Sequence, residues 1–436
     1  MNNSEQVEPD SKKKIMFDLT FLFDQYAKRG IGVYGKNVLK RLFTQLTQEG
    51  GYKIQILGFN SLEENLIELG YSQFAIEENK ENFDFFSLGK EKSSGINNFK
   101  EWENKYKPIL EEARPNIFYA AHFERGLPSV PKLKEKLNFE IKTIVVAHDA
   151  IPLVTNKFSA KGPIINFFKK RFFKEMWKGI QNADKIITAS NFSKSDIIKY
   201  GNVTSEKIDV IYLGVDEKFQ KENYTQSEEI QENTLETFSL VGKNYFFYDT
   251  GVEQNKGAIH LLKIFKEILN LNSPNLPNYL VITGRDFRKG VGLSIQPKSI
   301  LGDNFFRLAK KLGVAQNLIT TDKISDEQLV DLLFNAKVYL NLSTYEGFGL
   351  GIAQAMSAEI PVIAGNASCI PEIAQDGAFL IDLKKDMNYE ETAKKIEEYI
   401  NDKEKVNNTV KKGKKISKTY DWDKTVEQTL KLIKKL

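Results

Sequence analysis

The sequence predicts an α/β protein of two domains, each built on a parallel sheet with helices on both faces. Short β-branched or aromatic runs alternate with segments whose apolar residues recur at helical spacing, which is typical of parallel sheets. At 436 residues the chain is too long for one hydrophobic core. A polar, acid-rich stretch, residues 216–243, separates two such alternating series and is interpreted as the linker between the domains.

The first series begins with a strand at residues 15–18, and a helix follows Gly30-Ile31-Gly32-Val33-Tyr34. Gly30 and Gly32 either let the backbone approach a ligand closely or permit positive φ in a loop. The polar region 61–112 is less regular, and we expect it to form loops and helices that decorate the sheet. Further strands are predicted at residues 53–57, 117–119, 141–147, 185–189 and 208–212.

The second series predicts another α/β domain of the nucleotide-binding type. An amphipathic helix over residues 420–436 ends the chain, after a lysine-rich helix face around residues 411–418. The strands of this domain are expected at residues 245–248, 279–283, 318–320, 338–342, 361–364 and 378–381.

The composition excludes several classes of protein. A formal net charge of +4 argues against a dedicated nucleic-acid binder, so no nucleic-acid partner is expected. The single cysteine, Cys369, excludes an intrachain disulfide and fits a reducing compartment. The first fourteen residues are polar, and no run approaches the roughly 20 apolar residues that span a bilayer. We therefore expect a cytoplasmic protein, either soluble or peripheral to the inner face of the membrane.

Residues 164–178 (IINFFKKRFFKEMWK) allow two interpretations. This predicted helix is basic and strongly aromatic. Such a helix either lies on an anionic membrane surface or packs its aromatic side chains on its own sheet with its lysines in solvent.

The residues most suggestive of chemistry follow a predicted buried strand at 338–342. There the loop Ser343-Thr344-Tyr345-Glu346-Gly347-Phe348-Gly349 leads into a helix, a geometry in which backbone N–H groups converge on an anion. Glu346 and Gln354 offer acceptors for hydroxyl groups, and Lys256, in another strand-to-helix loop after Gly251, offers a cation. His148 follows an apolar strand directly, at the sheet edge where α/β proteins bind ligands, although a structural histidine fits the same place.

Several motifs together resemble the retaining glycosyltransferases of family 4, which have the GT-B fold. The likeness covers nearly the whole chain except the N-terminus, the 61–112 region and the linker. The motifs are Gly30-Ile31-Gly32-Val33-Tyr34, Ala147-His148-Asp149-Ala150-Ile151-Pro152-Leu153, Ala183-Asp184-Lys185-Ile186-Ile187-Thr188-Ala189-Ser190, Ile324-Ser325-Asp326-Glu327-Gln328-Leu329, Tyr345-Glu346-Gly347-Phe348-Gly349-Leu350, Pro361-Val362-Ile363-Ala364 and Ile370-Pro371-Glu372-Ile373.

The resemblance implies two Rossmann-like domains facing across a cleft. Residues 1–235 would bind the acceptor, residues 236–419 would bind a nucleotide-diphosphate (NDP) sugar, and helix 420–436 would pack back onto the first domain. It assigns catalytic roles to His148, Glu346 and Lys256. The implied donor-binding set is Gly32, Gly251, Lys256, Glu346, Gly347, Phe348, Gly349, Leu350 and Gln354.

Two positions depart from the family pattern. The second glutamate of the family's paired acidic motif is replaced by Gln354, and Asn255 stands where many members carry arginine. A charged hydrogen bond contributes about 1.5 to 3 kcal/mol and a neutral one about 0.5 to 1.5 kcal/mol, so altered nucleotide recognition is expected. Arg285 or Arg288 is a candidate to replace the missing cation.

The resemblance implies no metal and no cofactor other than the NDP-sugar co-substrate. Asp421-Trp422-Asp423 spells the D-x-D motif of metal-dependent transferases, but it opens the last helix, where aspartates favour caps and the positive helix end. Retention is usually explained in this family by front-side attack, in which the leaving diphosphate helps to deprotonate the acceptor. Such a reaction needs no protein nucleophile.

The function expected from the resemblance is transfer of a hexose from GDP-mannose, UDP-glucose or UDP-N-acetylglucosamine in cell-surface polysaccharide assembly. The acceptor would be a saccharide or glycoconjugate, lipid-linked if residues 164–178 touch a membrane. The alternative is a non-catalytic GT-B partner subunit that binds a glycan or a protein, which Gln354 and Asn255 suggest. An epimerase of the same fold is disfavoured by the Gly347-Phe348-Gly349-Leu350 context.

Overall fold

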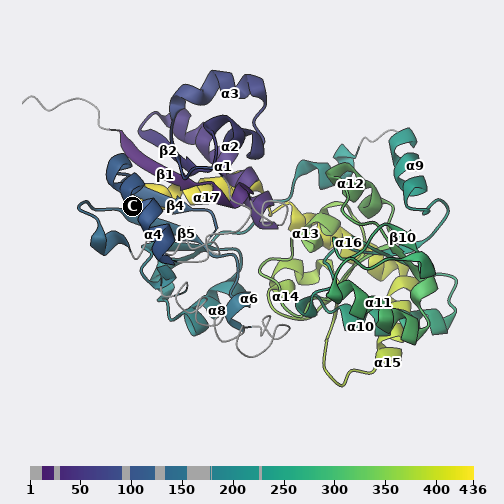
Figure 1. The fold of residues 1–436 in the computed structure, drawn as a ribbon. Coiled ribbons are helices and arrows are strands. Elements are labelled where there is room, and N and C mark those ends of the chain that lie inside the picture. The colour runs from purple at the N-terminus through teal and green to yellow at the C-terminus, as the bar shows by residue number, and fades with distance from the viewer. Residues whose placement is uncertain are drawn as a thin grey trace, which may run out of the picture. The chain divides into compact units, whose positions relative to one another are not determined.

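The computed structural model describes residues 12–23, 30–90, 99–122, 133–154, 177, 179–224 and 228–436. They divide into two compact units (Figure 1). The first holds the described residues up to Tyr212 together with Trp422–Leu436, and the second is Leu213–Asp421. Each unit has its own seven-stranded sheet, which confirms the predicted α/β architecture of two sheets.

All strands of the first sheet run parallel, in the order β3-β2-β1-β4-β5-β6-β7. Ile15 of β1 pairs with Ile54 on one side and Ile117 on the other, so the strand order changes direction between β1 and β4. Open α/β sheets bind ligands at the carboxyl ends of strands at such a point. The strands are β1 (Lys13–Asp18), β2 (Tyr52–Gly58), β3 (Phe83–Ser87), β4 (Ile117–Ala120), β5 (Lys142–Val146), β6 (Lys185–Thr188) and β7 (Ile208–Val210).

The last helix of the chain belongs to this first unit. It packs against α1, beside which it runs in Figure 1, and Thr425 Oγ1 donates to the carbonyl of Tyr212 at 2.8 Å. The helices of the unit are α1 (Gly30–Glu49), α2 (Leu62–Glu68), α3 (Gln73–Asn79), α4 (Phe99–Ala113), α6 (Ile151–Val154), α8 (Asn191–Gly201) and α17 (Trp422–Lys434).

One expectation for this unit was wrong, and one of two alternatives left open for the glycines is excluded. The 61–112 region contributes a strand, β3, to the edge of the sheet. Its sequence, FDFFS, is aromatic and favours a strand, but it is only five residues long and stands within an otherwise polar region. Gly30 and Gly32 do not form a positive-φ loop, because both lie in the first turn of α1.

The second sheet has the order β10-β11-β9-β8-β12-β13-β14 and changes direction between β8 and β12. All its pairings are parallel except that of β10, a short strand that the sequence did not suggest and that runs antiparallel to β11. The strands are β8 (Tyr245–Tyr248), β9 (Tyr279–Ile282), β10 (Gly290–Val291), β11 (Leu318–Thr320), β12 (Val338–Asn341), β13 (Val362–Gly365) and β14 (Phe379–Ile381).

The helices of the second unit pack in groups: α10 contacts α11 and α15, whereas α13 contacts α14 and α16. The apolar face of α10 enters the core formed by β8, β9 and β12. These helices are α9 (Glu228–Thr237), α10 (Ala258–Leu271), α11 (Ile300–Leu312), α12 (Asp326–Phe334), α13 (Leu350–Ser357), α14 (Ile370–Ala374), α15 (Tyr389–Asn401) and α16 (Lys403–Ser417).

The stretch interpreted as a linker is built into the second unit. Tyr224 stacks on Phe334 with ring centroids 4.1 Å apart, and Thr234 Oγ1 donates to Asp331 Oδ2 at 2.7 Å. Helix α9 therefore packs on α12, although its composition is acid-rich. The two units part after Tyr212, upstream of the boundary expected at residue 235.

The predicted helix 164–178 lies outside the described residues except for Trp177, which is buried in the core of the first unit. In the part of the chain that the structure describes, no helix combines the length and the apolar character needed to cross a membrane.

Candidate active site

The candidate site lies where β8 and β12 end side by side in the second sheet. These neighbouring strands are joined in register, Val338 pairing with Phe246. The loop after β8 runs to Gly257, and the loop after β12 runs to Gly349, where α13 begins. Because the strand order reverses between these two strands, their loops flank the crevice in which such sheets bind ligands.

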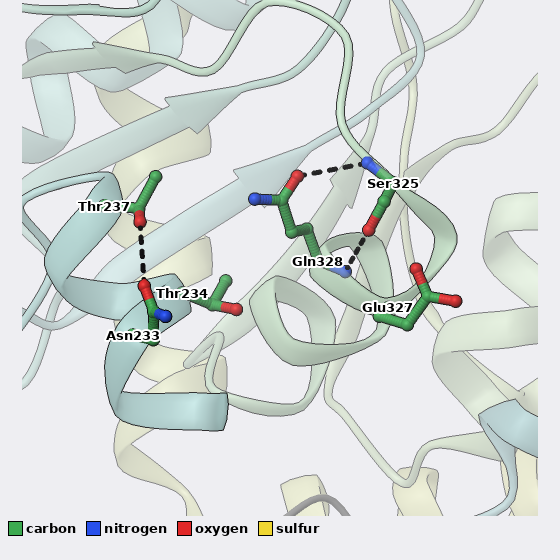
Figure 2. A pocket seen from close by; sticks show the side chains of 6 residues that line it. All are labelled: Asn233, Thr234, Thr237, Ser325, Glu327 and Gln328. Carbon is green, nitrogen blue, oxygen red and sulfur yellow. Dashed lines mark hydrogen bonds between the residues drawn. The ribbon is translucent and has the colours of Figure 1, made fainter. Parts of the chain in front are cut away.

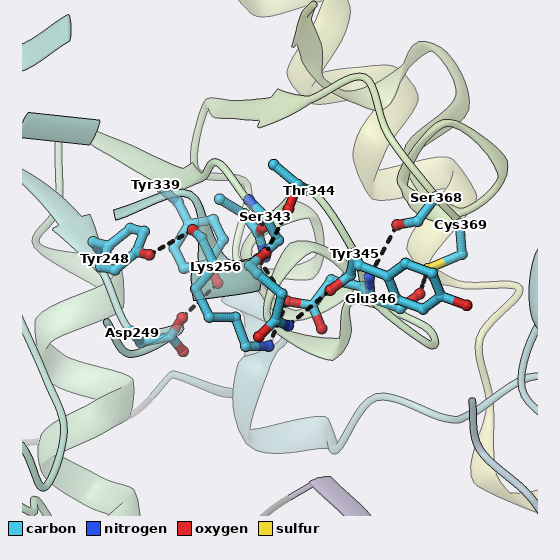
Figure 3. A network of polar contacts seen from close by, with 12 residues as sticks. Tyr248, Asp249, Lys256, Tyr339, Ser343, Thr344, Tyr345, Glu346, Ser368 and Cys369 are labelled. Carbon is cyan, nitrogen blue, oxygen red and sulfur yellow. Dashed lines mark hydrogen bonds and ion pairs between the residues drawn. The ribbon is translucent and has the colours of Figure 1, made fainter. Parts of the chain in front are cut away.

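Lys256 and Glu346 meet at this point (Figure 3). Lys256 Nζ donates to Glu346 Oε1 at 2.7 Å, and the two side chains are 21% and 13% exposed. Ser343 Oγ donates to the same oxygen at 2.7 Å. Within the described residues only Oε1 of this carboxylate accepts hydrogen bonds, and Oε2 accepts none.

The backbone of Glu346 is held on both sides. Its N–H donates to Ser368 Oγ at 3.0 Å, and its carbonyl accepts from the thiol of Cys369 at 3.2 Å. Burial raises the pKa of the Cys369 thiol well above its ordinary value, so this group donates a hydrogen bond and is not a thiolate nucleophile. The loop that carries Glu346 is thus tied to the segment before α14.

Asn255, one of the two departures from the family pattern, has a structural role. Its side chain is buried, and Nδ2 donates to the carbonyl of Tyr345 at 3.1 Å. Its own carbonyl accepts from the N–H of Thr344 at 2.8 Å. Asn255 therefore binds the loop after β8 to the loop after β12, a role that the sequence did not indicate.

The start of α13 has the form of an anion site. Gly349 caps the helix with φ of 84°, a conformation that favours glycine, so the N–H groups of Leu350 and Gly351 follow in the first turn. Gln354 lies one turn further on the same helix and is partly exposed. Phe348 is buried against Tyr420, with ring centroids 5.3 Å apart.

The other donor-site candidates of this unit lie in the same loops or near them. Gly251 has φ of 86° in the loop after β8, and Gly347 lies between Glu346 and Phe348. Arg285 lies in the loop after β9, and Arg288 lies further along toward β10. Both arginines are exposed, and neither forms an ion pair with any residue that the structure describes.

His148 and Gly32 belong to the first unit. His148 follows β5, and its ring meets that of Tyr34 edge to face at 4.8 Å. Burial, with a smaller contribution from the neighbouring His122, lowers the pKa of His148 to about 3. The imidazole is therefore neutral at physiological pH, and its Nε2 has no hydrogen-bond partner among the described residues. Tyr34 Oη in turn is 2.9 Å from Tyr119 Oη.

The structure thus brings together Lys256 and Glu346 in the second unit, beside the start of α13. Sequence reasoning missed the residues that hold this pair, namely Ser343, Ser368, Cys369 and Asn255. Small polar side chains carry no periodic signal, and their partners lie up to 90 residues away in the chain.

A separate open pocket of about 340 Å³ lies between α9 and α12 (Figure 2). Hydroxyl, amide and carboxylate groups line it, and none of its lining residues is cationic, so it does not suit a diphosphate. The lining residues are Asn233, Thr234, Thr237, Ser325, Glu327 and Gln328.

No group of three or more His, Cys, Asp or Glu side chains is placed to hold a metal ion within the described ranges. Of the D-x-D sequence, Asp423 lies in the first turn of α17 and forms an ion pair with Arg41 at 3.2 Å.

Two protein families match this sequence. Residues 227–416 match the family described as glycosyl transferases group 1, and residues 88–219 match glycosyltransferase family 4. Together the two matches include the loops that carry His148, Lys256 and Glu346.

The curated relatives are mannosyltransferases of low identity. The chain is 24% identical to the serotype-specific mannosyltransferase WbdA of Escherichia coli over 58% of its own length and 28% of that protein. It is 24% identical to the O-antigen chain mannosyltransferase RfbU of Salmonella typhimurium over 57% of this chain and 62% of the other. It therefore spans less than two thirds of either relative.

Solved structures resemble the chain over nearly its whole length. Anabaena Alr3699/HepE in complex with UDP-glucose superposes with a TM-score of 0.67 at 15% identity, covering 97% of this chain and 100% of the other. WaaG, a glycosyltransferase involved in lipopolysaccharide biosynthesis, gives 0.65 at 13% identity, covering 96% and 99%. These likenesses confirm the predicted fold, the GT-B type.

Proposed function

Because this chain belongs to glycosyltransferase family 4 of the group 1 glycosyl transferases, we propose that it transfers a hexose from an NDP-sugar to a saccharide or glycoconjugate acceptor. The proposed setting is cell-surface polysaccharide assembly. The observation that carries the proposal is the Lys256–Glu346 pair beside the glycine-capped start of α13. That arrangement supplies a cation, backbone donors and a carboxylate oxygen at one point.

Each part of this arrangement answers a need of the donor. The N–H groups of Leu350 and Gly351, together with Lys256, suit a diphosphate, because helix starts and ammonium groups stabilise anions. Glu346 Oε2 is left to accept a hydrogen bond from a sugar hydroxyl. Electrostatic stabilisation of the leaving diphosphate would be the main catalytic effect.

His148 is proposed to contact the donor sugar as a neutral imidazole. Its low pKa means that it can donate or accept a hydrogen bond but adds no positive charge. The edge-to-face contact with Tyr34 fixes the orientation of the ring. The reaction is proposed to retain the anomeric configuration and to need no metal and no protein nucleophile.

The donor is proposed to be a hexose on GDP or UDP. The matched relatives WbdA and RfbU are named as mannosyltransferases, which favours GDP-mannose as the first donor to test. The structural neighbour HepE was solved with UDP-glucose, so UDP-glucose and UDP-N-acetylglucosamine belong in the same panel. A cytoplasmic location, peripheral to the inner face of the membrane, and a lipid-linked acceptor are parts of the proposal.

The test is hydrolysis or transfer with a panel of NDP-sugars, read as released NDP, alongside NDP binding by calorimetry. We expect turnover with one donor and loss of it in Glu346→Gln and Lys256→Ala. A folded protein with neither NDP binding nor turnover would instead indicate the non-catalytic partner subunit. Thermal stabilisation by the cognate NDP supplies an independent measure of binding.

A further inference from the structure

Asp249 lies at the base of the proposed diphosphate site. It is the first residue after β8, and its side chain is partly buried. Tyr339, which points across from β12, donates its hydroxyl to Asp249 Oδ1 at 2.5 Å (Figure 3). The carboxyl is therefore held in one place by the neighbouring strand.

The same pair lies directly against the first turn of α13. A Cβ atom placed on Gly351 would come 3.3 Å from Asp249 Oδ1 and 2.1 Å from the Tyr339 hydroxyl. Only glycine fits there, and the backbone of the helix start approaches the carboxyl closely. The N–H groups of that turn are the ones assigned above to the diphosphate.

The charged and titratable groups around Asp249 come from both loops. The Tyr339 hydrogen bond and the Lys256 cation both favour the ionised form of Asp249, whereas the Glu346 carboxylate disfavours it. Tyr248 lies nearby. Burial has the largest effect and raises the pKa of Asp249 above its ordinary value of 3.8. Asp249 consequently stays protonated up to a higher pH than an exposed aspartate does.

We propose that the carboxylate of Asp249 opposes the binding of the diphosphate at the start of α13 and so limits how tightly the nucleotide product is held. The inference rests on the proposed function, since it requires an NDP at that helix. The Asp249 carboxylate and the diphosphate carry like charges and repel each other. The negative charge of Asp249 also reduces the positive potential that the start of α13 offers to a diphosphate. Asp249 thus weakens NDP binding when it is ionised and ceases to do so when it is protonated.

The experiment measures GDP and UDP affinity by calorimetry from pH 5 to 8 for the wild type and Asp249→Asn. Unit charges several ångströms apart at an effective dielectric constant of about 20 predict on the order of tenfold tighter binding by Asp249→Asn at pH 8. The ratio of the two affinities should fall toward one as the pH is lowered. Asp376→Asn, at an exposed aspartate that pairs with Lys412, is the matched control and should leave the affinity unchanged.

Equal affinity of wild type and Asp249→Asn at every pH, or weaker binding by a folded Asp249→Asn, overturns the inference and leaves the proposed function intact. If neither GDP nor UDP binds the wild type, the proposed function itself fails.

Tyr339→Phe is a second test that keeps the aspartate in place. The variant removes the hydrogen bond that stabilises the carboxylate, so Asp249 should be protonated up to a higher pH. As the pH rises, the NDP affinity of Tyr339→Phe should therefore stay equal to that of Asp249→Asn up to a higher pH than the wild-type affinity does. Above that pH it should fall to the wild-type value. An affinity profile identical to that of the wild type contradicts the inference.

Discussion

Asn255 donates its side-chain amide to the carbonyl oxygen of Tyr345 at 3.1 Å and thereby joins the two loops that carry Lys256 and Glu346. The family resemblance implied arginine at this position, so asparagine suggested a lost phosphate contact. In this protein the residue is buried and holds the site together instead.

Asn255→Ala should lower the free energy of unfolding by about 1 to 3 kcal/mol, because it leaves the buried Tyr345 carbonyl without this donor. Asn255→Arg should also destabilise the protein and should not tighten NDP binding, since the side chain points into the structure. Denaturant titration and calorimetry measure both effects. Asn304→Ala, at an exposed position on α11, is the control and should stay within about 0.5 kcal/mol of wild type.

Lys256→Ala should lower the transfer rate by about 10²- to 10³-fold, as expected when one donor to a developing negative charge is removed. NDP affinity should fall as well, because the Lys256 cation is also proposed to contact the diphosphate before the reaction. Lys266→Ala, at a neighbouring lysine on α10 outside the site, should keep wild-type kinetics. A Lys256→Ala enzyme with an unchanged rate would refute the assigned role.

Gly257→Ala should destabilise the protein strongly. Gly257 has φ of 71°, and a Cβ atom there would lie 1.7 Å from the carbonyl oxygen of Leu342, so the two loops would have to separate. Gly242→Ala is a matched control, since Gly242 has φ of 69° but no atom within 4 Å of its added Cβ. In the control the free energy of unfolding should fall by only about 1 to 2 kcal/mol, the cost of a left-handed backbone conformation for alanine. If thermal unfolding shows that both variants are destabilised equally, the contact with Leu342 is unimportant.

His148 should stay neutral through the range of activity, so the pH profile of transfer should show no ionisation from this residue between pH 5 and 8. The pKa is about 3 in the folded protein against an ordinary value of 6.5. As the pH falls, this histidine takes up a proton in the unfolded chain before it does so in the folded protein. The free energy of unfolding that depends on His148 is therefore full above pH 6.5 and decreases as the pH falls toward 3. NMR titration of the imidazole measures this directly.

His148→Ala should cut transfer sharply while the circular dichroism spectrum stays unchanged. Near-normal transfer would leave His148 as a structural histidine packed on Tyr34.

Local sequence signals located most of the fold. The predicted strands at residues 245–248 and 318–320 coincide with β8 and β11, and the other predicted strands differ from the observed ones by one or two residues in total at their ends. β3 is a short aromatic run of five residues, FDFFS, and the polar composition of the surrounding 61–112 region hid this strand signal. The acidic stretch around α9 was mistaken for a linker because its contacts are made by a few residues, such as Thr234 with Asp331.

The sequence by itself determined the α/β alternation, the two sheets, and the loops that bear His148, Lys256 and Glu346, because periodicity and glycine placement are local properties. Only the tertiary structure decided which side chains meet. The Lys256–Glu346 pair and the Asp249–Tyr339 bond each join residues 90 positions apart, through the parallel pairing of β8 with β12. Such contacts depend on which strands become neighbours, and no local pattern encodes that neighbour relationship.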